Sequence, residues 1–264
     1  MDARIPVQIQ PIIETYSAQI DRNLSELVSS FYIVGSIALN GFNPYFSDID
    51  FITLLQRPAN MEEIAKLGEI HQTIEAEHPK WKFSGIYLQS KDVGKSENEI
   101  APQPYYHDGK MHARGTFEIN SVTWWVLKNY GIIIKGVAPA QLDFEVDWDF
   151  LISSMWENLN SYWLSWTKQI KRYPVLLTDW GIQWTVLGVL RQYYTFQENS
   201  ITTKEKAGEY ALEYLPSRWK ALILDALCIR TGQEERFYRS RIKRAIIDRS
   251  FLKEVIRICN GLFE

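Results

Sequence analysis

The segment from residue 31 to residue 55 constrains the fold of this chain more than any other part of the sequence. Residues 31–34 and 51–55 are apolar and predict two β-strands. Between them, Gly35-Ser36 predicts a turn into a short helix, and Ser47-Asp48-Ile49-Asp50 leads into the second strand. Each feature is common alone, but their succession within one short segment indicates a functional site rather than coincidence.

Asp48 and Asp50 predict a site for a divalent cation. Alternate side chains of a strand point to the same face, so the two residues project together, with their Cα atoms roughly 6–7 Å apart. The apolar Ile49 between them is expected to face the core. Two such carboxylates can hold one or two Mg²⁺ ions, which complete their coordination with water and substrate phosphates. The pair therefore favours phosphoryl or nucleotidyl transfer; the alternative is a solvent-facing acidic pair at a strand start.

The Gly35-Ser36 turn predicts phosphate binding beside these carboxylates. Gly35 lets a phosphate tail approach the backbone, and Ser36 offers a hydroxyl and an amide at a helix N-terminus, where anions are favoured. The alternative is a structural turn with a serine helix cap. The loop contains no lysine, which excludes the phosphate-binding loop of the G-x-x-x-x-G-K-[ST] kind.

Composition narrows the class of protein. The 264 residues suit one large domain or two modest ones, and the net charge of −3 gives no basic field that would indicate a nucleic-acid partner. Cys228 and Cys259 are expected to be buried free thiols, because their spacing fits no zinc site. No targeting segment and no apolar run of transmembrane length occurs, so we expect a cytoplasmic protein without a membrane partner.

The hydrophobic pattern divides the chain into two parts. Residues 7–29, 58–77 and 121–130 predict helices, residues 81–88 predict a third strand, and residues 89–115 predict an irregular functional loop. After a linker at residues 137–146 we expect only helices, at residues 148–172, 180–197, 203–213, 217–230 and 236–259. The pattern therefore predicts an α/β catalytic domain at residues 1–146 and an all-α helical bundle domain at residues 147–264.

Several of these motifs resemble those of a known family. The Gly35-Ser36 turn and the Asp48-Ile-Asp50 strand are similar to the signature of the nucleotidyltransferase superfamily. Residues 120–136, residues 187–195 (Leu-Gly-Val-Leu-Arg-Gln-Tyr-Tyr-Thr) and residues 203–207 resemble the aminoglycoside adenylyltransferases that modify streptomycin and spectinomycin. The resemblance covers nearly the whole chain. It implies an α/β (α+β) nucleotidyltransferase domain with a small mixed sheet, followed by the helical bundle.

The resemblance also implies roles for individual residues. Asp48 and Asp50 are then the Mg²⁺ ligands, and Gly35 and Ser36 hold the β- and γ-phosphates of ATP.

Three basic residues of the helical part have implied roles as well. Arg191 and Lys204 match family positions that reach the ATP phosphates, and Arg230 matches a position near another nucleotide contact. From the sequence alone, each of these residues is otherwise an exposed helix charge.

Two positions depart from the family pattern. Ser84 stands on the third strand where relatives carry the glutamate that acts as general base, and Glu118 and His112 are candidate substitutes. Loss of a general base costs about 10²–10⁴-fold in rate. Gly181 stands where relatives carry an acidic residue that holds the aminoglycoside, with Asp179 two positions away.

The resemblance therefore implies a Mg²⁺-dependent transferase that moves AMP from ATP to a hydroxyl of a small molecule. An aminoglycoside-type antibiotic is the favoured acceptor, which implies a role in antibiotic resistance. One alternative is a catalytically weakened nucleotide-binding protein. The other is an adenylyltransferase that acts on another small hydroxylated molecule or on a protein.

Overall fold

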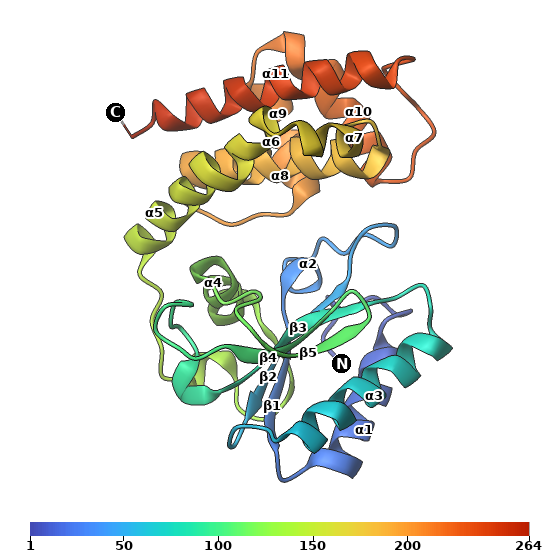
Figure 1. The fold of residues 1–264 in the computed structure, drawn as a ribbon, viewed down its shortest axis with the longest axis vertical. Coiled ribbons are helices and arrows are strands. Elements are labelled where there is room, and N and C mark those ends of the chain that lie inside the picture. The colour runs from blue at the N-terminus through green and yellow to red at the C-terminus, as the bar shows by residue number, and fades with distance from the viewer. Residues whose placement is uncertain (264) are drawn as a thin grey trace. The chain divides into compact units, whose positions relative to one another are not determined.

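The chain folds into two compact units. The structure is a computed structural model that describes residues 1–263 (Figure 1). The first unit contains Met1–Phe42 and Ser47–Asp147, and the second contains Asn43–Phe46 and the chain from Trp148 onward. Each unit has its own hydrophobic core, so the two are described separately below.

A six-stranded mixed sheet forms the centre of the first unit. The strand order is β5-β4-β3-β2-β1-β6. β2 and β3 are parallel, whereas all other neighbours are antiparallel. The small mixed sheet that the family resemblance implied is therefore present. The strands are β1 (Val28–Ile33), β2 (Ile49–Leu55), β3 (Phe83–Gln89), β4 (Gln103–His107), β5 (Lys110–Gly115) and β6 (Ile132–Lys135).

Helices α1 (Gln10–Leu24) and α3 (Met61–Glu77) pack side by side in the first unit (Figure 1). α3 connects the parallel strands β2 and β3, since parallel neighbours need a crossover connection. Asn60 caps α3 and forms a capping box with Glu63, which fixes where the helix begins. Two further helices, α2 (Gly35–Ala38) and α4 (Ser121–Tyr130), contact each other.

The β4–β5 hairpin corrects the prediction of an irregular loop at residues 89–115. His107 and Lys110 pair across a two-residue turn, in which Asp108 and Gly109 both have positive φ angles, 49° and 72°. An Asp-Gly pair with two left-handed residues is the favoured tight connection of a hairpin, because its twist matches that of the strands. The prediction of an irregular stretch is wrong for residues 103–115. It overlooked the Asp-Gly signal because neither strand alternates clearly between apolar and polar residues.

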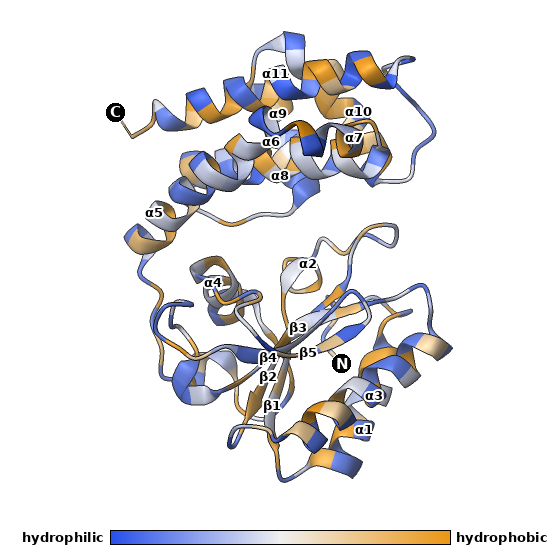
Figure 2. Cartoon of the chain, in the orientation of Figure 1, coloured by the Kyte–Doolittle hydropathy of each residue, from blue (hydrophilic) through white to orange (hydrophobic). Residues whose placement is uncertain are grey.

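Helices alone make up the second unit over residues 148–263. α8 (Asp179–Glu198) lies at its centre and contacts α9 (Lys204–Tyr214), α10 (Lys220–Arg230) and α11 (Arg241–Asn260). The buried residues of α8 include Ile182, Val186, Leu187, Val189 and Leu190. Figure 2 shows hydrophobic and hydrophilic residues alternating along α11, as expected of an amphipathic helix on a bundle surface.

The predicted helix at residues 148–172 is broken into shorter elements. α5 (Trp148–Asn158) runs through a π-helical turn at Leu159–Trp163 into α6 (Leu164–Lys168). A 3₁₀ turn at Ile170–Arg172 and α7 (Tyr173–Leu176) follow. The π turn places the Trp163 ring against Gly188 of α8, where no larger residue fits.

The structure confirms the expected state of both cysteines, since Cys228 and Cys259 are free and buried. Among the helices of residues 1–263, none has the length and apolar character needed to cross a membrane.

Candidate active site

The acidic pair lies at the start of β2. Asp50 is the second residue of this strand and is half-buried, whereas Asp48 precedes the strand and is exposed. Ile49 between them is fully buried, as its apolar side chain predicts. The buried isoleucine anchors the strand and directs the two carboxylates away from the core.

Gly35 lies directly against the Asp50 carboxylate. Its φ angle is +58°, and a Cβ atom at this position would overlap Asp50 Oδ2. The backbone N–H of Ser36 donates to the same oxygen at 3.4 Å, and the N–H of Val34 donates to the Asp50 carbonyl at 2.9 Å. The Gly-Ser turn and the acidic strand therefore form one structural element, and only glycine allows it to close.

Ser36 carries a feature that fits an anionic ligand. Its hydroxyl oxygen is buried, and within the described residues it makes no hydrogen bond. Most buried polar atoms in folded proteins have a hydrogen-bond partner, so an orphan hydroxyl needs an explanation. A phosphate oxygen beside the turn would supply the missing acceptor.

The donor set fits a magnesium ion that arrives with its substrate. Among residues 1–263, no group of three or more His, Cys, Asp or Glu side chains is arranged to hold a metal. A metal site at Asp48 and Asp50 would therefore have these two carboxylates as its His, Cys, Asp or Glu ligands. Mg²⁺ commonly binds one or two carboxylates and takes its other ligands from water and phosphates.

A row of polar side chains continues from Asp50 across the sheet. Asp50 pairs with Ser84 in the parallel register of β2 and β3, so both side chains lie on the same face. The hydroxyl of Ser84 lies 3.0 Å from Nδ1 of His107 on β4. Asp50, Ser84 and His107 therefore occupy three adjacent strands, with Ser84 in the middle.

His107 is the functional candidate that sequence reasoning missed. Its ring packs in a tilted arrangement against Phe117, with ring centroids 4.5 Å apart, and its Nε2 lies 3.5 Å from Oδ2 of the exposed Asp108. The available signal was its position directly before the Asp-Gly turn, which places it at the end of a hairpin strand.

The two substitutes considered for the missing glutamate have other contacts. His112 on β5 stacks on Tyr105, with ring centroids 4.4 Å apart and an interplanar angle of 4°. Glu118 accepts a hydrogen bond from the Thr123 hydroxyl at 3.0 Å, at the start of α4. Ser84 is hydrogen-bonded to neither of them but to His107.

The three basic residues of the second unit are partly or fully buried. Arg191 lies within α8, and Lys204 begins α9 with its ammonium over the Trp184 ring at 4.3 Å. Arg230, the last residue of α10, is 4% exposed and forms an ion pair with Glu205 at 2.8 Å. None of the three is therefore the exposed helix charge of the alternative interpretation.

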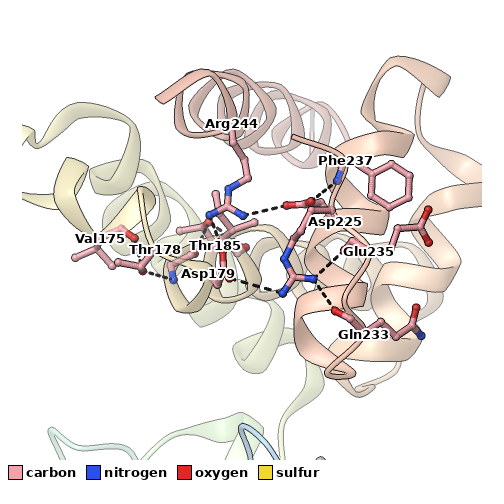
Figure 3. Close-up of polar contacts among 12 residues, drawn as sticks. Val175, Thr178, Asp179, Thr185, Asp225, Gln233, Glu235, Phe237 and Arg244 are labelled. Atoms are coloured by element: carbon pink, nitrogen blue, oxygen red, sulfur yellow. Dashed lines mark hydrogen bonds and ion pairs between the residues drawn. The ribbon is translucent and has the colours of Figure 1, made fainter. Parts of the chain in front are cut away.

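The Gly181 position is closed to any side chain. A Cβ atom there would overlap the backbone carbonyl oxygen of Val175. The neighbouring Asp179 is paired with Arg244 at 2.8 Å, and Arg244 also contacts Asp225 at 3.2 Å (Figure 3). Arg236 approaches Asp179 as well, at 3.7 Å. The charge of Asp179 is thus balanced within the second unit.

Two protein families match successive parts of the chain. Residues 16–101 match the nucleotidyltransferase domain, and residues 145–247 match the C-terminal domain of aminoglycoside adenylyltransferase. A comparison with curated proteins finds no match.

A solved structure has a similar fold. It is the crystal structure of spectinomycin adenyltransferase AAD(9) from Enterococcus faecialis with ATP and spectinomycin. The similarity has a TM-score of 0.67 at 15% sequence identity, and covers 92% of this chain and 99% of that chain. At this identity the likeness shows a shared fold.

Proposed function

Because this chain combines a nucleotidyltransferase domain with an aminoglycoside adenylyltransferase C-terminal domain, we propose that it transfers AMP from ATP to a hydroxyl of a small molecule. The observation that carries the proposal is the Gly35-Ser36 turn, which packs on Asp50 and leaves a buried serine hydroxyl without a partner among the described residues. This arrangement suits a triphosphate bound beside two carboxylates.

Each residue of the turn and strand has a specific role in the proposal. Asp48 and Asp50 hold Mg²⁺, which when bound offsets negative charge on the phosphates and on the attacking oxygen. Gly35 lets the phosphates approach the backbone, and the Ser36 hydroxyl and amide donate to their oxygens. We assign this chemistry to residues 1–146. In the helical residues 147–264, the assignment of Arg191, Lys204 and Arg230 to the ATP phosphates stays a prediction from the family resemblance.

The family resemblance favours an aminoglycoside-type antibiotic as the acceptor. The contacts at residues 179 and 181 support a second candidate. A polycationic drug needs carboxylates around it, but residue 181 has no space for one and Asp179 is paired with arginines. These contacts favour a hydroxylated acceptor with less positive charge as the second candidate. The third candidate is a nucleotide-binding protein with weakened catalysis, because Ser84 replaces the expected carboxylate.

The experiment is a measurement of pyrophosphate release from Mg²⁺-ATP with a panel of acceptors. The panel contains streptomycin, spectinomycin and uncharged hydroxylated compounds, and ATP affinity is measured in parallel by calorimetry. We expect one acceptor to stimulate release in the wild type and no release in Asp48→Asn or Asp50→Asn. Full activity in either variant would contradict the metal assignment. ATP binding without release for every acceptor would favour the weakened nucleotide-binding protein.

A further inference from the structure

We propose that Ser84 and His107 together take the proton from the acceptor hydroxyl, in place of the carboxylate that relatives use. This inference rests on the proposed nucleotidyl transfer and names the residues that complete it. Ser84 is the group that touches the acceptor, and His107 acts through Ser84.

The geometry of the sheet places Ser84 beside the proposed metal site. Asp50 and Ser84 are direct partners in the β2–β3 register, and neighbouring strands lie about 4.8 Å apart. A group bound at Asp50 on this face is therefore within reach of the residue next to it. Ser84 is 6% exposed, so its hydroxyl lies in a largely dry environment where a fixed partner determines its orientation.

His107 is held in the orientation that a proton relay needs. Its Nδ1 lies 3.0 Å from the Ser84 hydroxyl and accepts from it in the tautomer that carries the ring proton on Nε2. Nε2 in turn lies 3.5 Å from the Asp108 carboxylate, and the ring packs on Phe117. Asp108 lies in the turn that directly follows β4, so the hairpin places this carboxylate beside the His107 imidazole.

The proposed step balances in atoms and charge. The acceptor oxygen forms a bond to the α-phosphorus of ATP, and the bond from this phosphorus to the bridging oxygen breaks, with the electron pair leaving on pyrophosphate. The acceptor proton passes to Ser84 Oγ while the Ser84 hydroxyl proton passes to His107 Nδ1. The imidazolium, beside the Asp108 carboxylate, then releases its Nε2 proton to water. Proton exchange with solvent returns the ring to the tautomer that carries its proton on Nε2.

A purely structural role for the pair is the alternative. A buried serine that hydrogen-bonds to a histidine on the next strand stabilises the pairing of β3 with β4 without any catalytic role. The two interpretations differ in what a substitution changes. A structural role changes the melting temperature, whereas a proton-accepting role changes kcat and leaves ATP affinity intact.

The experiment compares five variants of the full chain with the wild type on the acceptor panel, and one of them, Ser84→Glu, introduces the carboxylate that relatives carry. Ser84→Ala and His107→Asn remove each half of the pair, and His78→Asn, at the histidine that follows α3, is the matched control. For each protein we measure kcat, KM, ATP affinity by calorimetry and the melting temperature. We expect kcat to fall about 10²–10⁴-fold in Ser84→Ala and His107→Asn, with ATP affinity unchanged, and to stay at the wild-type level in the control. A further variant, His107→Ala, should regain activity when free imidazole is added, which a structural role does not explain.

The outcomes distinguish failure of the proton-accepting role of Ser84 and His107 from failure of the proposed nucleotidyltransferase function. If the wild type is active, two results contradict the proton-accepting role of Ser84 and His107. One is an unchanged kcat in His107→Asn, and the other is an inactive His107→Ala that imidazole does not rescue. If the wild type is inactive and Ser84→Glu is active, then Ser84 and His107 do not accept the proton. The nucleotidyltransferase assignment is supported in that case. If both the wild type and Ser84→Glu are inactive with every acceptor, the proposed function is rejected. The proton-accepting role of Ser84 and His107, which rests on it, is then rejected as well.

Discussion

The carboxylate of Asp50 occupies the space that a side chain at residue 35 would need. Gly35 has a φ angle of +58°, and any Cβ atom there would overlap Asp50 Oδ2. This relationship joins the first residue of α2 to strand β2, which follows α2 after a loop. It explains in physical terms why a glycine is required directly ahead of a serine at this point.

Gly35→Ala is expected to abolish ATP binding. The added methyl group displaces the Asp50 carboxylate and moves the turn that is proposed to hold the phosphates. Gly109→Ala is the matched control, because Gly109 also has a positive φ angle, +72°, but its nearest atom to a new Cβ is Glu75 Oε2 at 3.6 Å. Both variants carry a left-handed alanine, which costs roughly 1–2 kcal/mol. Calorimetry should show ATP binding in Gly109→Ala only; equal binding in both would show that the close approach has no functional role.

Local sequence patterns predicted the parts of the site that depend on local structure. The apolar strand with Asp50 and the Gly35 turn both follow from neighbouring residues. Such patterns suffice because each of these features depends on residues that are close together in the sequence.

The part of the site that sequence reasoning missed depends on long-range pairing. The Ser84–His107 contact requires β3 and β4 to pair, and the two residues are 23 positions apart. Exposure on β5 is mixed, so its residues show no clean alternation, and only the Asp108-Gly109 turn marked the hairpin. The π-helical turn after Asn158 brings Trp163 against Gly188, and the helical periodicity of the sequence does not predict this turn.

Gly181→Asp, which introduces the acidic residue that relatives carry, is expected to destabilise the second unit. A Cβ atom at residue 181 meets the backbone oxygen of Val175, and a backbone atom cannot move as a flexible side chain can. Overpacking of this kind costs about 1–3 kcal/mol. Gly261→Ala serves as control, since its new Cβ would lie 3.6 Å from the nearest carbonyl oxygens. Thermal melts should show a lower melting temperature for Gly181→Asp and an unchanged one for Gly261→Ala. A stable Gly181→Asp variant that binds streptomycin would contradict the view that residue 181 has no space for a side chain.

His71 is expected to make the first unit sensitive to acid. Burial lowers the pKa of its imidazole to about 3, and its Nε2 lies 2.5 Å from the Tyr87 hydroxyl. The ring is packed by Tyr16 at 4.7 Å and Tyr106 at 4.0 Å, and with Tyr87 these tyrosines are titratable groups that face it. The unfolded chain binds a proton below about pH 6.5, whereas the folded state stays neutral, so stability is present above that pH and is lost as the pH falls toward 3.

An NMR titration tests the His71 prediction without relying on a variant's stability. The histidine signal that disappears in His71→Phe should keep its chemical shift in the wild type from pH 5 to pH 8. A signal that moves in this range would show that the imidazole gains a proton in the folded protein, and would remove the acid-sensitivity argument.

Asp248 is expected to have the opposite effect in the second unit. Burial raises the pKa of its carboxyl to about 8, although a hydrogen bond from Thr185 at 2.9 Å and the nearby Arg244 oppose this shift. Arg244 is itself shared between Asp225 and Asp179 (Figure 3), so its charge is largely used by those carboxylates. Asp248 is therefore protonated in the folded state at neutral pH.

The sign of the Asp248 effect follows from proton linkage. Between about pH 4 and pH 8 the folded state holds a proton that the unfolded chain has lost, so stability falls as the pH rises through this window, by at most about 1.4 kcal/mol per pH unit. Asp248→Asn mimics the protonated carboxyl and removes this dependence. The melting temperature of the variant relative to the wild type should therefore rise from pH 5 to pH 8. A constant difference across that range would show that Asp248 keeps one protonation state in both the folded and the unfolded protein, and that the buried carboxyl has no linked effect on stability.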